Sequence, residues 1–467
     1  MAKDANIKNP HSLGVAEFVS GLTFEDIPAA VIERIKLLML DSIGCGIYGA
    51  NLPWTNILKK TLGAIDSSND CSLFGSDQKL SAPHAALVNG TQIQGFELDD
   101  VHRNGVLHVG AVTLPPLFAI VEGRPDIDGK AFLTAAVAGY EVGPRVGLCM
   151  GQEHIGQGWH SGATLGVFSA AAGAARVLNL SIDQTVNALG IAGTQAAGLM
   201  AAQYGSMVKR MHAGRSAQSG LYGALLAEQG FTGIQDVFEA PYGGFCSTFS
   251  RSHDRYNLAA LTEGLGIDFE VMRVALKFYS CVGSNHTSLD AIKHIQSRRP
   301  FGVDDFDKIV IYGSQVTADH VGWPYQPQGL TSAQLNLPFC VATLLLEGDV
   351  FVKQFKPDCV ENKARIDLSR RVEVLHDPKI TALGAKFRHK VTVEVHYKNG
   401  ALETETREAP IGSEHSFGSE ADIVRKFVKL TDGLMTSRAQ KAVVESMLNL
   451  EDLDNAGKLV GLIAASK

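Results

Sequence analysis

Long helical segments that are rich in small residues are the feature of this sequence that most limits its fold. Apolar residues recur at helical spacing from about Ser12 to Ala260. Two of these segments, 162–178 and 188–205, place glycine, alanine and serine where larger side chains would hold neighbouring helices apart. An interior glycine costs up to about 1 kcal/mol relative to alanine, so such helices depend on close packing. The pattern therefore predicts closely packed, centrally buried helices.

The middle of the chain has the pattern of a mixed α+β fold. Residues 307–314 and 370–378 have the composition and alternation of short strands. Residues 390–410 predict a hairpin, in which Asn399 and Gly400 supply the positive φ angles of a tight turn.

The two ends of the chain share one pattern, because helical spacing returns after Gly418. The sequence therefore predicts a mainly α fold with an α+β insertion. Residues 1–266 and 418–467 are expected to form one large all-helical domain, and residues 267–417 a smaller α+β domain. The 467 residues, 45% of them hydrophobic, suffice to give each domain a core.

Charge and hydropathy exclude several classes of partner. The 42 basic and 49 acidic residues give a formal charge of -7 and form no long blocks, which argues against binding to nucleic acid or to an anionic membrane. The sequence has no uninterrupted apolar run of the roughly 18 residues that a spanning helix needs. Its first residues have neither the apolar core of a signal peptide nor the arginine-rich pattern of a transit peptide.

The seven cysteines are odd in number, far apart and never in a Cys-x-x-Cys pair. This distribution argues against a disulfide framework and against a zinc knuckle. Together with the absence of a targeting pattern, it predicts a soluble protein of the cytoplasm.

The common cofactor and nucleophile motifs are absent from the sequence. It contains no G-x-x-x-x-G-K-[ST] loop, no G-x-S-x-G elbow and no H-E-x-x-H pair. The glycine-rich piece 156–162 neither follows a strand nor has dinucleotide-binding spacing. Redox chemistry with a nucleotide cofactor and phosphoryl transfer are therefore disfavoured.

Residues 95–111 concentrate carboxylates and histidines in one short segment. Asp99 and Asp100 could cap a helix start, since aspartate accepts hydrogen bonds from exposed N–H groups there. The alternative is general acid/base work, in which a carboxylate holds one imidazole in a defined tautomer. His102 and His108 are the two histidines available in the segment.

The surroundings of His108 favour the acid/base interpretation. Gly105, Gly110 and the Pro115-Pro116 pair are expected to break the flanking helical pattern. His108 would then lie on irregular backbone, where catalytic residues are disproportionately found.

A basic cluster is formed by Lys209, Arg210, His212 and Arg215. Taken alone it is typical of a basic helix end beside water. Its functional interpretation is an anion site, because several cations within seven residues suit a substrate with more than one carboxylate.

His286, Asp290 and His294 are spaced four residues apart and would share one face of a helix. Such a row could hold a metal for a hydrolytic reaction. A helix cap and a solvated face explain it better, so no metal is predicted.

Taken together, these segments resemble the MmgE/PrpD family, which includes 2-methylcitrate dehydratase, cis-aconitate decarboxylase and iminodisuccinate epimerase. The likeness extends over nearly the whole chain. The segments that carry it are residues 26–50, 95–112, 158–175, 189–220, 243–245 and 281–286.

The resemblance implies a homodimer whose subunits have a large helical domain and a smaller lid domain, with an active site that uses neither a metal nor an organic cofactor. Matched position by position, the family's catalytic residues fall on Asp99, Asp100, His108, His160, Lys209 and His286. The residues implied to bind the substrate's carboxylates are His160, Lys209, His212 and Arg215. The chain departs from the family at Val101, where Thr is frequent, and at Val109, where Pro is frequent.

The implied function is a cofactor-independent lyase for a small di- or tricarboxylic acid. Decarboxylation of cis-aconitate to itaconate is favoured, with Lys209 and His160 binding carboxylates and His108 and an aspartate moving the proton. Dehydration of 2-methylcitrate and epimerisation of iminodisuccinate are the alternatives within the family. A non-catalytic carboxylate-binding protein is the alternative outside it.

Overall fold

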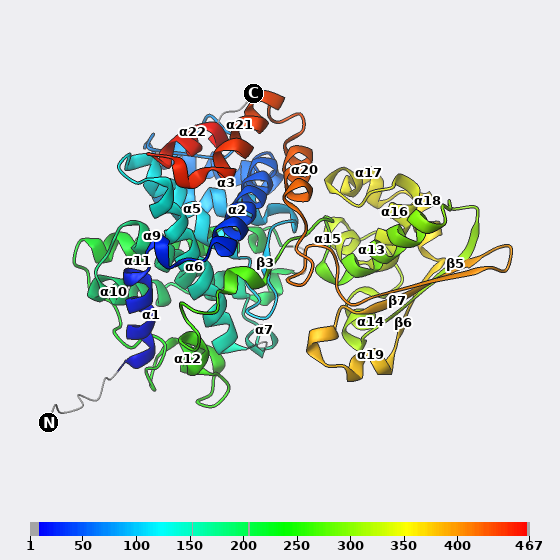
Figure 1. The fold of residues 1–467 in the computed structure, drawn as a ribbon, viewed down its shortest axis with the longest axis horizontal. Helices are drawn as coiled ribbons and strands as arrows, with labels where there is room; N and C mark the ends of the chain where they lie inside the picture. Colours follow the sequence, from blue (N-terminus) through cyan, green and yellow to red (C-terminus); the bar gives the residue numbers. More distant parts are fainter. Residues whose placement is uncertain (1–8, 152, 204–205, 465–467) are drawn as a thin grey trace. The chain divides into compact units, whose positions relative to one another are not determined.

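A computed structural model describes residues 9–151, 153–203 and 206–464 of the chain (Figure 1). Its described residues form two compact units. The first unit comprises Met1–Gly95, Asp99–Ala275 and Ser419–Lys467, and the second comprises Phe96–Leu98 and Leu276–Gly418. The fold is mainly helical with a small α+β part, so the predicted fold class is confirmed.

The first unit is built almost entirely of helices. They are α1 (Pro10–Gly21), α2 (Ala29–Gly49), α3 (Pro53–Gly63), α4 (Ala82–Ile93), α5 (Val109–Gly123), α6 (Gly129–Met150), α7 (Glu153–Gly156), α8 (Ser161–Thr164), α9 (Gly166–Val177), α10 (Ile182–Gly193), α11 (Val208–Glu228), α12 (Phe245–Ser250), α20 (Glu420–Thr431), α21 (Ser437–Leu448) and α22 (Gly457–Ala464). Its strands are the two-residue pairs β1 (Cys71–Ser72) with β2 (Lys79–Leu80), and β3 (Val101–His102) with β4 (Val274–Ala275).

Small residues let the central helices of the first unit approach one another closely. A Cβ on Gly90 of α4 would lie 2.7 Å from the Cα of Gly214 on α11. A Cβ on Gly143 of α6 would lie 2.6 Å from the side chain of Ser169 on α9. Real Cβ atoms do not approach other atoms so closely, so larger residues would push these helices apart. The predicted close packing of buried, small-residue helices is confirmed.

The predicted helix over 188–205 is wrong in its second half. Helix α10 ends at Gly193, and a turn follows. The backbone beyond this point forms hydrogen bonds with the segment around His160. The carbonyl of Gly198 accepts from the N–H of His160, and the N–H of Met200 donates to the carbonyl of Gly158. These bonds satisfy backbone groups that a continued helix would have used itself. Gly205, which closes the predicted segment, lies outside the described residues, as do residues 1–8 of the expected untargeted start.

Pro115 and Pro116 were expected to break the helical pattern, and this prediction is wrong, because α5 continues through both of them. Each proline removes a helical hydrogen bond, which costs about 3 kcal/mol in a helix interior. Every residue of α5 from Val109 to Val121 is buried, and its apolar packing offsets that loss. His108 nevertheless lies on irregular backbone, with φ -81° and ψ 87°, as the residue that precedes the helix.

The second unit packs helices with one four-stranded sheet. Its helices are α13 (Gly283–Arg298), α14 (Gln315–Val321), α15 (Leu330–Leu335), α16 (Leu337–Glu347), α17 (Pro357–Val360), α18 (Lys363–Ser369) and α19 (Pro378–Ala382). Its strands are β5 (Phe306–Gly313), β6 (Val372–His376), β7 (Val391–Tyr397) and β8 (Leu402–Arg407), in the order β6-β5-β7-β8 (Figure 1). β5 and β6 are parallel, and the other pairs are antiparallel.

The predicted strands and hairpin of the middle segment are present. Val391, Val393 and Val395 of β7 are buried and alternate with partly exposed residues, as the period of a strand requires. The turn differs from the expected one in that Gly400 has a positive φ of 83°, whereas Asn399 is not in the left-handed region.

The helices of the described residues were compared with the requirements for a membrane span. None of these helices combines the length and apolar character that a bilayer span requires.

Candidate active site

Residues 99–108, which precede α5, form the acidic loop of the first unit, and His102 anchors it. The Nδ1 atom of His102 accepts from the N–H of Gly105 at 2.9 Å, and its Nε2 atom lies 2.9 Å from a carboxylate oxygen of Glu270. Both side chains are buried. His102 therefore has a structural role in holding the loop against the segment that contains Glu270.

Close packing fixes the course of the loop. The carbonyl oxygen of Gly105 lies only 2.0 Å from the position of a Cβ on Gly147 of α6, so no side chain fits there. Val106 has a φ of 50°, a left-handed conformation that is strained for a β-branched residue. The hydroxyl of Ser161, at the start of α8, donates to the carbonyl of Val106. This bond joins the loop to the helix that follows His160.

His108 and Asp99 form a hydrogen-bonded pair in the loop. The Nδ1 atom of His108 lies 2.9 Å from Oδ2 of Asp99. The imidazole is 16% exposed, whereas the carboxylate is completely buried. Because an ionised carboxylate only accepts, Nδ1 carries the hydrogen, and Nε2 is the ring atom left to exchange a proton with a ligand.

Asp100 has different hydrogen-bond partners from Asp99. Its carboxylate accepts from the N–H of Gly110 in the first turn of α5 at 2.9 Å and from the hydroxyl of Tyr140 at 2.8 Å. Burial and the nearby charge of Asp99 raise the pKa of Asp100 to about 7. Asp100 is thus a cap at the helix start, which is one of the two interpretations that the sequence left open for the paired aspartates.

His160 and His212 lie against each other. His160 precedes α8, as a residue at a helix start, and its ring centroid is 4.7 Å from that of His212 on α11. The hydroxyl of Ser216 on α11 donates to the carbonyl of Gly162 on α8 at 2.7 Å and holds the two helices together. Burial, and then the charge of Lys209, lower the pKa of His212. This shift favours the neutral form of the His212 imidazole.

The rest of the basic cluster spreads over the surface of α11. Lys209 is partly buried in the first turn, near His212. Arg210 is buried, and its guanidinium lies 5.6 Å from the ring centroid of Trp54 on α3. Arg215 is exposed and donates to the side chain of Gln218. Lys209 and His212 thus share one side of the helix start, and Arg210 faces another helix.

His286 belongs to the second unit, where α13 carries it. Its Nε2 atom lies 3.0 Å from the carbonyl oxygen of Cys281, which can only accept, so Nε2 carries a hydrogen. The ring also packs edge-on against Tyr279.

The row of His286, Asp290 and His294 is not arranged around a common point. Asp290 accepts from the hydroxyl of Tyr279 at 2.6 Å and from the N–H of Ile411 at 2.7 Å. His294 is 42% exposed and lies near Glu405 instead. Across residues 9–151, 153–203 and 206–464, no group of three or more His, Cys, Asp or Glu side chains has the arrangement of a metal site.

A buried ion pair joins α20 to α2 and was not singled out from the sequence. The Nζ atom of Lys426 on α20 lies 2.5 Å from Oδ1 of Asp41 on α2, and both side chains are almost completely buried. The only sequence signal for it is a charged residue on an otherwise apolar helix face, as in the series Ile423, Lys426, Phe427 and Leu430 of α20.

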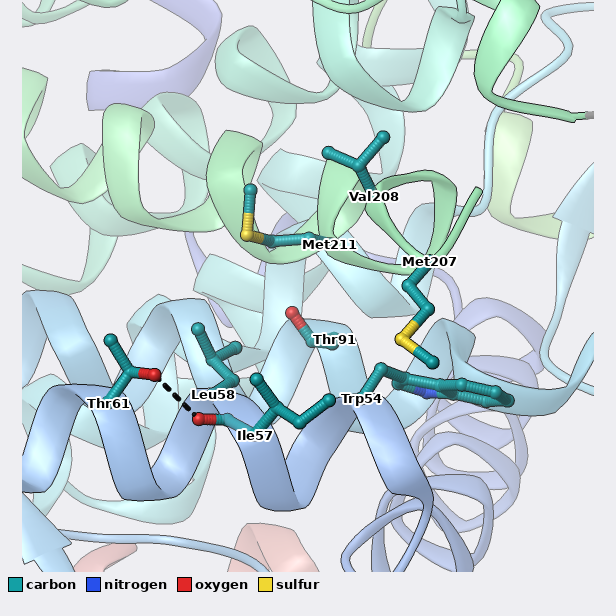
Figure 2. A pocket seen from close by; sticks show the side chains of 8 residues that line it. All are labelled: Trp54, Ile57, Leu58, Thr61, Thr91, Met207, Val208 and Met211. Carbon is teal, nitrogen blue, oxygen red and sulfur yellow. Dashed lines mark hydrogen bonds between the residues drawn. The ribbon is translucent and has the colours of Figure 1, made fainter. Parts of the chain in front are cut away.

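A pocket of the first unit lies beside Lys209 but has different chemistry (Figure 2). It has a volume of about 200 Å³ and is lined by Trp54, Ile57, Leu58, Thr61, Thr91, Met207, Val208 and Met211. The hydroxyls of Thr61 and Thr91 donate to carbonyls of their own helices. The lining is therefore apolar, and it does not suit a substrate with several carboxylates.

Comparisons with known proteins give matches along nearly the whole chain. A family model for the MmgE/PrpD N-terminal domain matches residues 14–256, and one for the MmgE/PrpD C-terminal domain matches residues 279–452. A cis-aconitate decarboxylase-like protein of Aspergillus oryzae is 34% identical, over 96% of this chain and 96% of its own length.

Further relatives match over nearly their whole length. A cis-aconitate decarboxylase of Aspergillus terreus is 31% identical over 98% of this chain and 97% of its own length. The cis-aconitate decarboxylase of Homo sapiens is 26% identical over 96% of this chain and 93% of its own length. Two family models that together cover most of the chain, and relatives above 30% identity that match from end to end, show that the chain belongs to the MmgE/PrpD family.

Proposed function

We propose that this protein is a carboxy-lyase that converts cis-aconitate to itaconate and carbon dioxide. The observation that carries the proposal is the end-to-end similarity, at 31–34% identity, to fungal proteins named cis-aconitate decarboxylase or cis-aconitate decarboxylase-like. The geometry of the first unit supports it, because a partly exposed histidine with a buried carboxylate partner lies in a loop joined to a second segment that carries histidines.

The proposed reaction breaks one C–C bond and forms one C–H bond. Loss of carbon dioxide leaves an electron pair that is delocalised over the allylic system and its remaining carboxylates. One proton must then be delivered to the carbon at the other end of that system to give itaconate. The protein therefore has two tasks: to stabilise the developing negative charge and to supply one proton.

Lys209, His160, His212 and Arg215 are proposed to bind the carboxylates of the substrate. A tricarboxylate brings three negative charges together, and their repulsion opposes the formation of a further carbanion-like charge. Cations and N–H donors arranged in advance reduce this repulsion most in the transition state. The proximity of Lys209 and His212, and the contact between His160 and His212, support a common carboxylate site on the first unit.

His108 is proposed to transfer the proton through Nε2. Asp99 accepts the hydrogen bond from Nδ1, orients the ring and stabilises its charged form. Asp100 would act indirectly, by fixing the start of α5. His286, in the second unit, remains a proposed catalytic residue on the basis of the family resemblance, with Nδ1 as the ring atom not bonded to the Cys281 carbonyl.

A proton NMR time course tests the function. Chelator-treated protein is incubated with cis-aconitate in one tube, 2-methylcitrate in a second and iminodisuccinate in a third. Vinylic itaconate signals in the first tube are expected and would also establish that the reaction needs no metal. Turnover in the second or third tube alone would replace the proposal with dehydration or epimerisation. A binding signal by calorimetry without turnover in any tube would indicate a non-catalytic carboxylate-binding protein.

We further propose a homodimer that acts in the cytoplasm. The dimer is supported by the family resemblance. The location is supported by the cysteines, all seven of which lie in the described part of the chain as free thiols, six of them buried. Light scattering of the purified protein is expected to give twice the mass of one chain, and fractionation of the source cells is expected to recover the protein with cytoplasmic markers.

A further inference from the structure

The ion pair between Lys426 and Asp41 belongs to a larger buried cluster of charges. Lys426 is 2% exposed and Asp41 is not exposed at all, yet their charged atoms are only 2.5 Å apart. The thiol of Cys45, one helical turn after Asp41, lies 4.0 Å from the same carboxylate. Burying charges is costly unless they are paired, so this pair must be offset by the interactions around it.

Asp41 and Lys426 are electrostatically coupled to the aspartates of the loop. Burial alone would lower the pKa of Lys426, but the charge and hydrogen bond of Asp41, together with the charge of Asp99, outweigh it, and the pKa is raised. The pKa of Asp100 is raised by burial, by Asp99 and also by Asp41. The titratable groups of the cluster are Asp41, Cys45, Asp99, Asp100, His108, Tyr140 and Lys426.

The packing at the start of α5 explains why these groups lie together. A Cβ on Gly110 would lie 2.1 Å from Oγ of Ser42, 2.7 Å from the hydroxyl of Tyr140 and 3.2 Å from a carboxylate oxygen of Asp100. Helix α2, helix α6 and the acidic loop therefore converge at the residue that is two positions after His108. Helix α20 packs on α2 and brings Lys426, from the far end of the sequence, to Asp41, the residue before Ser42.

We propose that Lys426, held by Asp41, is a positioning residue for the His108–Asp99 pair. Its buried ammonium group stabilises the carboxylate of Asp99, which keeps the Nδ1–H of His108 engaged and Nε2 available for proton transfer. Lys426 does not touch the substrate in this proposal. The role in catalysis rests on the proposed function, whereas the electrostatic coupling to His108 does not.

Two single variants of opposite sign test the coupling. Lys426→Met removes a positive charge, so every proton in the cluster becomes harder to remove. Asp41→Asn removes a negative charge, so every proton becomes easier to remove. The readout is the titration of the His108 imidazole, followed by NMR on protein with labelled histidine and assigned with a His108→Gln variant. This readout requires no catalytic activity, so it stands even if the substrate is not cis-aconitate.

We expect the titration of His108 to move up in Lys426→Met and down in Asp41→Asn, by on the order of 1 pH unit in each case, because a nearby positive charge favours loss of a proton and a nearby negative charge opposes it. The double variant Asp41→Asn/Lys426→Met should return near the wild-type position. With cis-aconitate, the pH profile of kcat should move in the same directions, and KM should stay within about twofold because the pair does not bind substrate.

A merely structural role for the pair predicts a different result. It would lower the thermal midpoint of both single variants without opposite shifts of the His108 titration, and that outcome would overturn the proposal. Removing one partner of a buried pair is strongly destabilising. If Lys426→Met does not fold, Asp41→Asn is the deciding variant, because it keeps the charge of Lys426 in the cluster. A downward shift of the His108 titration then supports the proposal, and an unchanged titration refutes it.

Discussion

The imidazole of His108 and the carboxylate of Asp99 are joined by a 2.9 Å contact between Nδ1 and Oδ2, with the ring partly exposed and the carboxylate buried. This arrangement assigns the two ring nitrogens different tasks. Nδ1 is committed to the protein, and Nε2 is directed away from that contact. A residue that must exchange a proton with a substrate needs this division, because the free nitrogen must be in a known protonation state.

The first prediction concerns this pair. His108→Ala is expected to lower kcat for cis-aconitate by about 100-fold or more, since a positioned acid or base contributes about 10²–10⁴-fold. Asp99→Asn should also lower kcat, because an amide can hold the ring in the other tautomer. Both are measured by steady-state kinetics, with circular dichroism to establish that the variants fold.

A second histidine–aspartate pair of the same unit offers a matched control. The Nδ1 atom of His84 lies 2.6 Å from Oδ2 of Asp66, so this contact joins the same two kinds of atom as the His108–Asp99 contact but lies outside the acidic loop. His84→Ala should keep wild-type kcat. Equal losses in His84→Ala and His108→Ala would indicate an effect on folding and not on proton transfer.

The second prediction concerns substrate binding. Lys209→Met is expected to raise KM by roughly 10-fold or more, because a hydrogen bond to a charged group contributes about 1.5–3 kcal/mol. A smaller fall in kcat should accompany it, since the same charge stabilises the transition state. Lys441→Met is the control, because that lysine is 77% exposed and pairs with Glu445 at the surface. An unchanged KM in Lys209→Met would remove Lys209 from the site.

The third prediction concerns the packing at the start of α5. Gly110→Ala would place a methyl group 2.1 Å from Oγ of Ser42 and 2.7 Å from the hydroxyl of Tyr140. The free energy of unfolding should fall by about 1–3 kcal/mol or more, as for other overpacked cores. Gly123→Ala is the control in the same helix, because nothing lies within 4 Å of the added carbon. Urea denaturation of the two variants measures the difference.

The fourth prediction concerns pH. The pKa of Asp100 is raised to about 7 by burial and Asp99, above its value of about 3.9 in an unfolded chain. The folded state therefore binds this proton more tightly than the unfolded state, and the contribution of Asp100 to stability falls as pH rises from about 4 to 7. The stability advantage of wild type over Asp100→Asn should thus be smaller at pH 8 than at pH 5.

Comparing the variant with wild type is essential to the pH measurement. Burial also raises the pKa of Glu141 to about 7, so it contributes a pH dependence of the same sign. That contribution is present in both proteins and cancels in the difference. A difference in the free energy of unfolding that is constant between pH 5 and 8 would show that Asp100 keeps an ordinary pKa in the folded protein.

The sequence by itself determined the class of the fold and the family. Helical spacing, strand alternation and the positions of small residues act locally or between neighbouring helices, so they can be read from residue types alone. In this way the sequence predicted the helices rich in glycine and alanine as far as the end of α10 at Gly193, the strands β5 to β8 and the return to helix after Gly418. The candidate site residues were matched by resemblance, and their roles stay predictions.

Tertiary structure decided which groups meet. The sequence offered two histidines and three carboxylates in one segment, and only the packing of the loop on α6 assigned His102 to Glu270 and His108 to Asp99. It also carried α5 through Pro115 and Pro116, because burial of that helix outweighs the hydrogen bonds that the prolines lose.

The pairing of Asp41 with Lys426 is the clearest example of a contact that the sequence does not predict, because no local pattern links residues at opposite ends of the chain. Residue type and spacing report what a segment can form by itself. The partners of a buried charge are set by the helices that pack around it, since only a folded core makes an unpaired charge costly and a paired one stable.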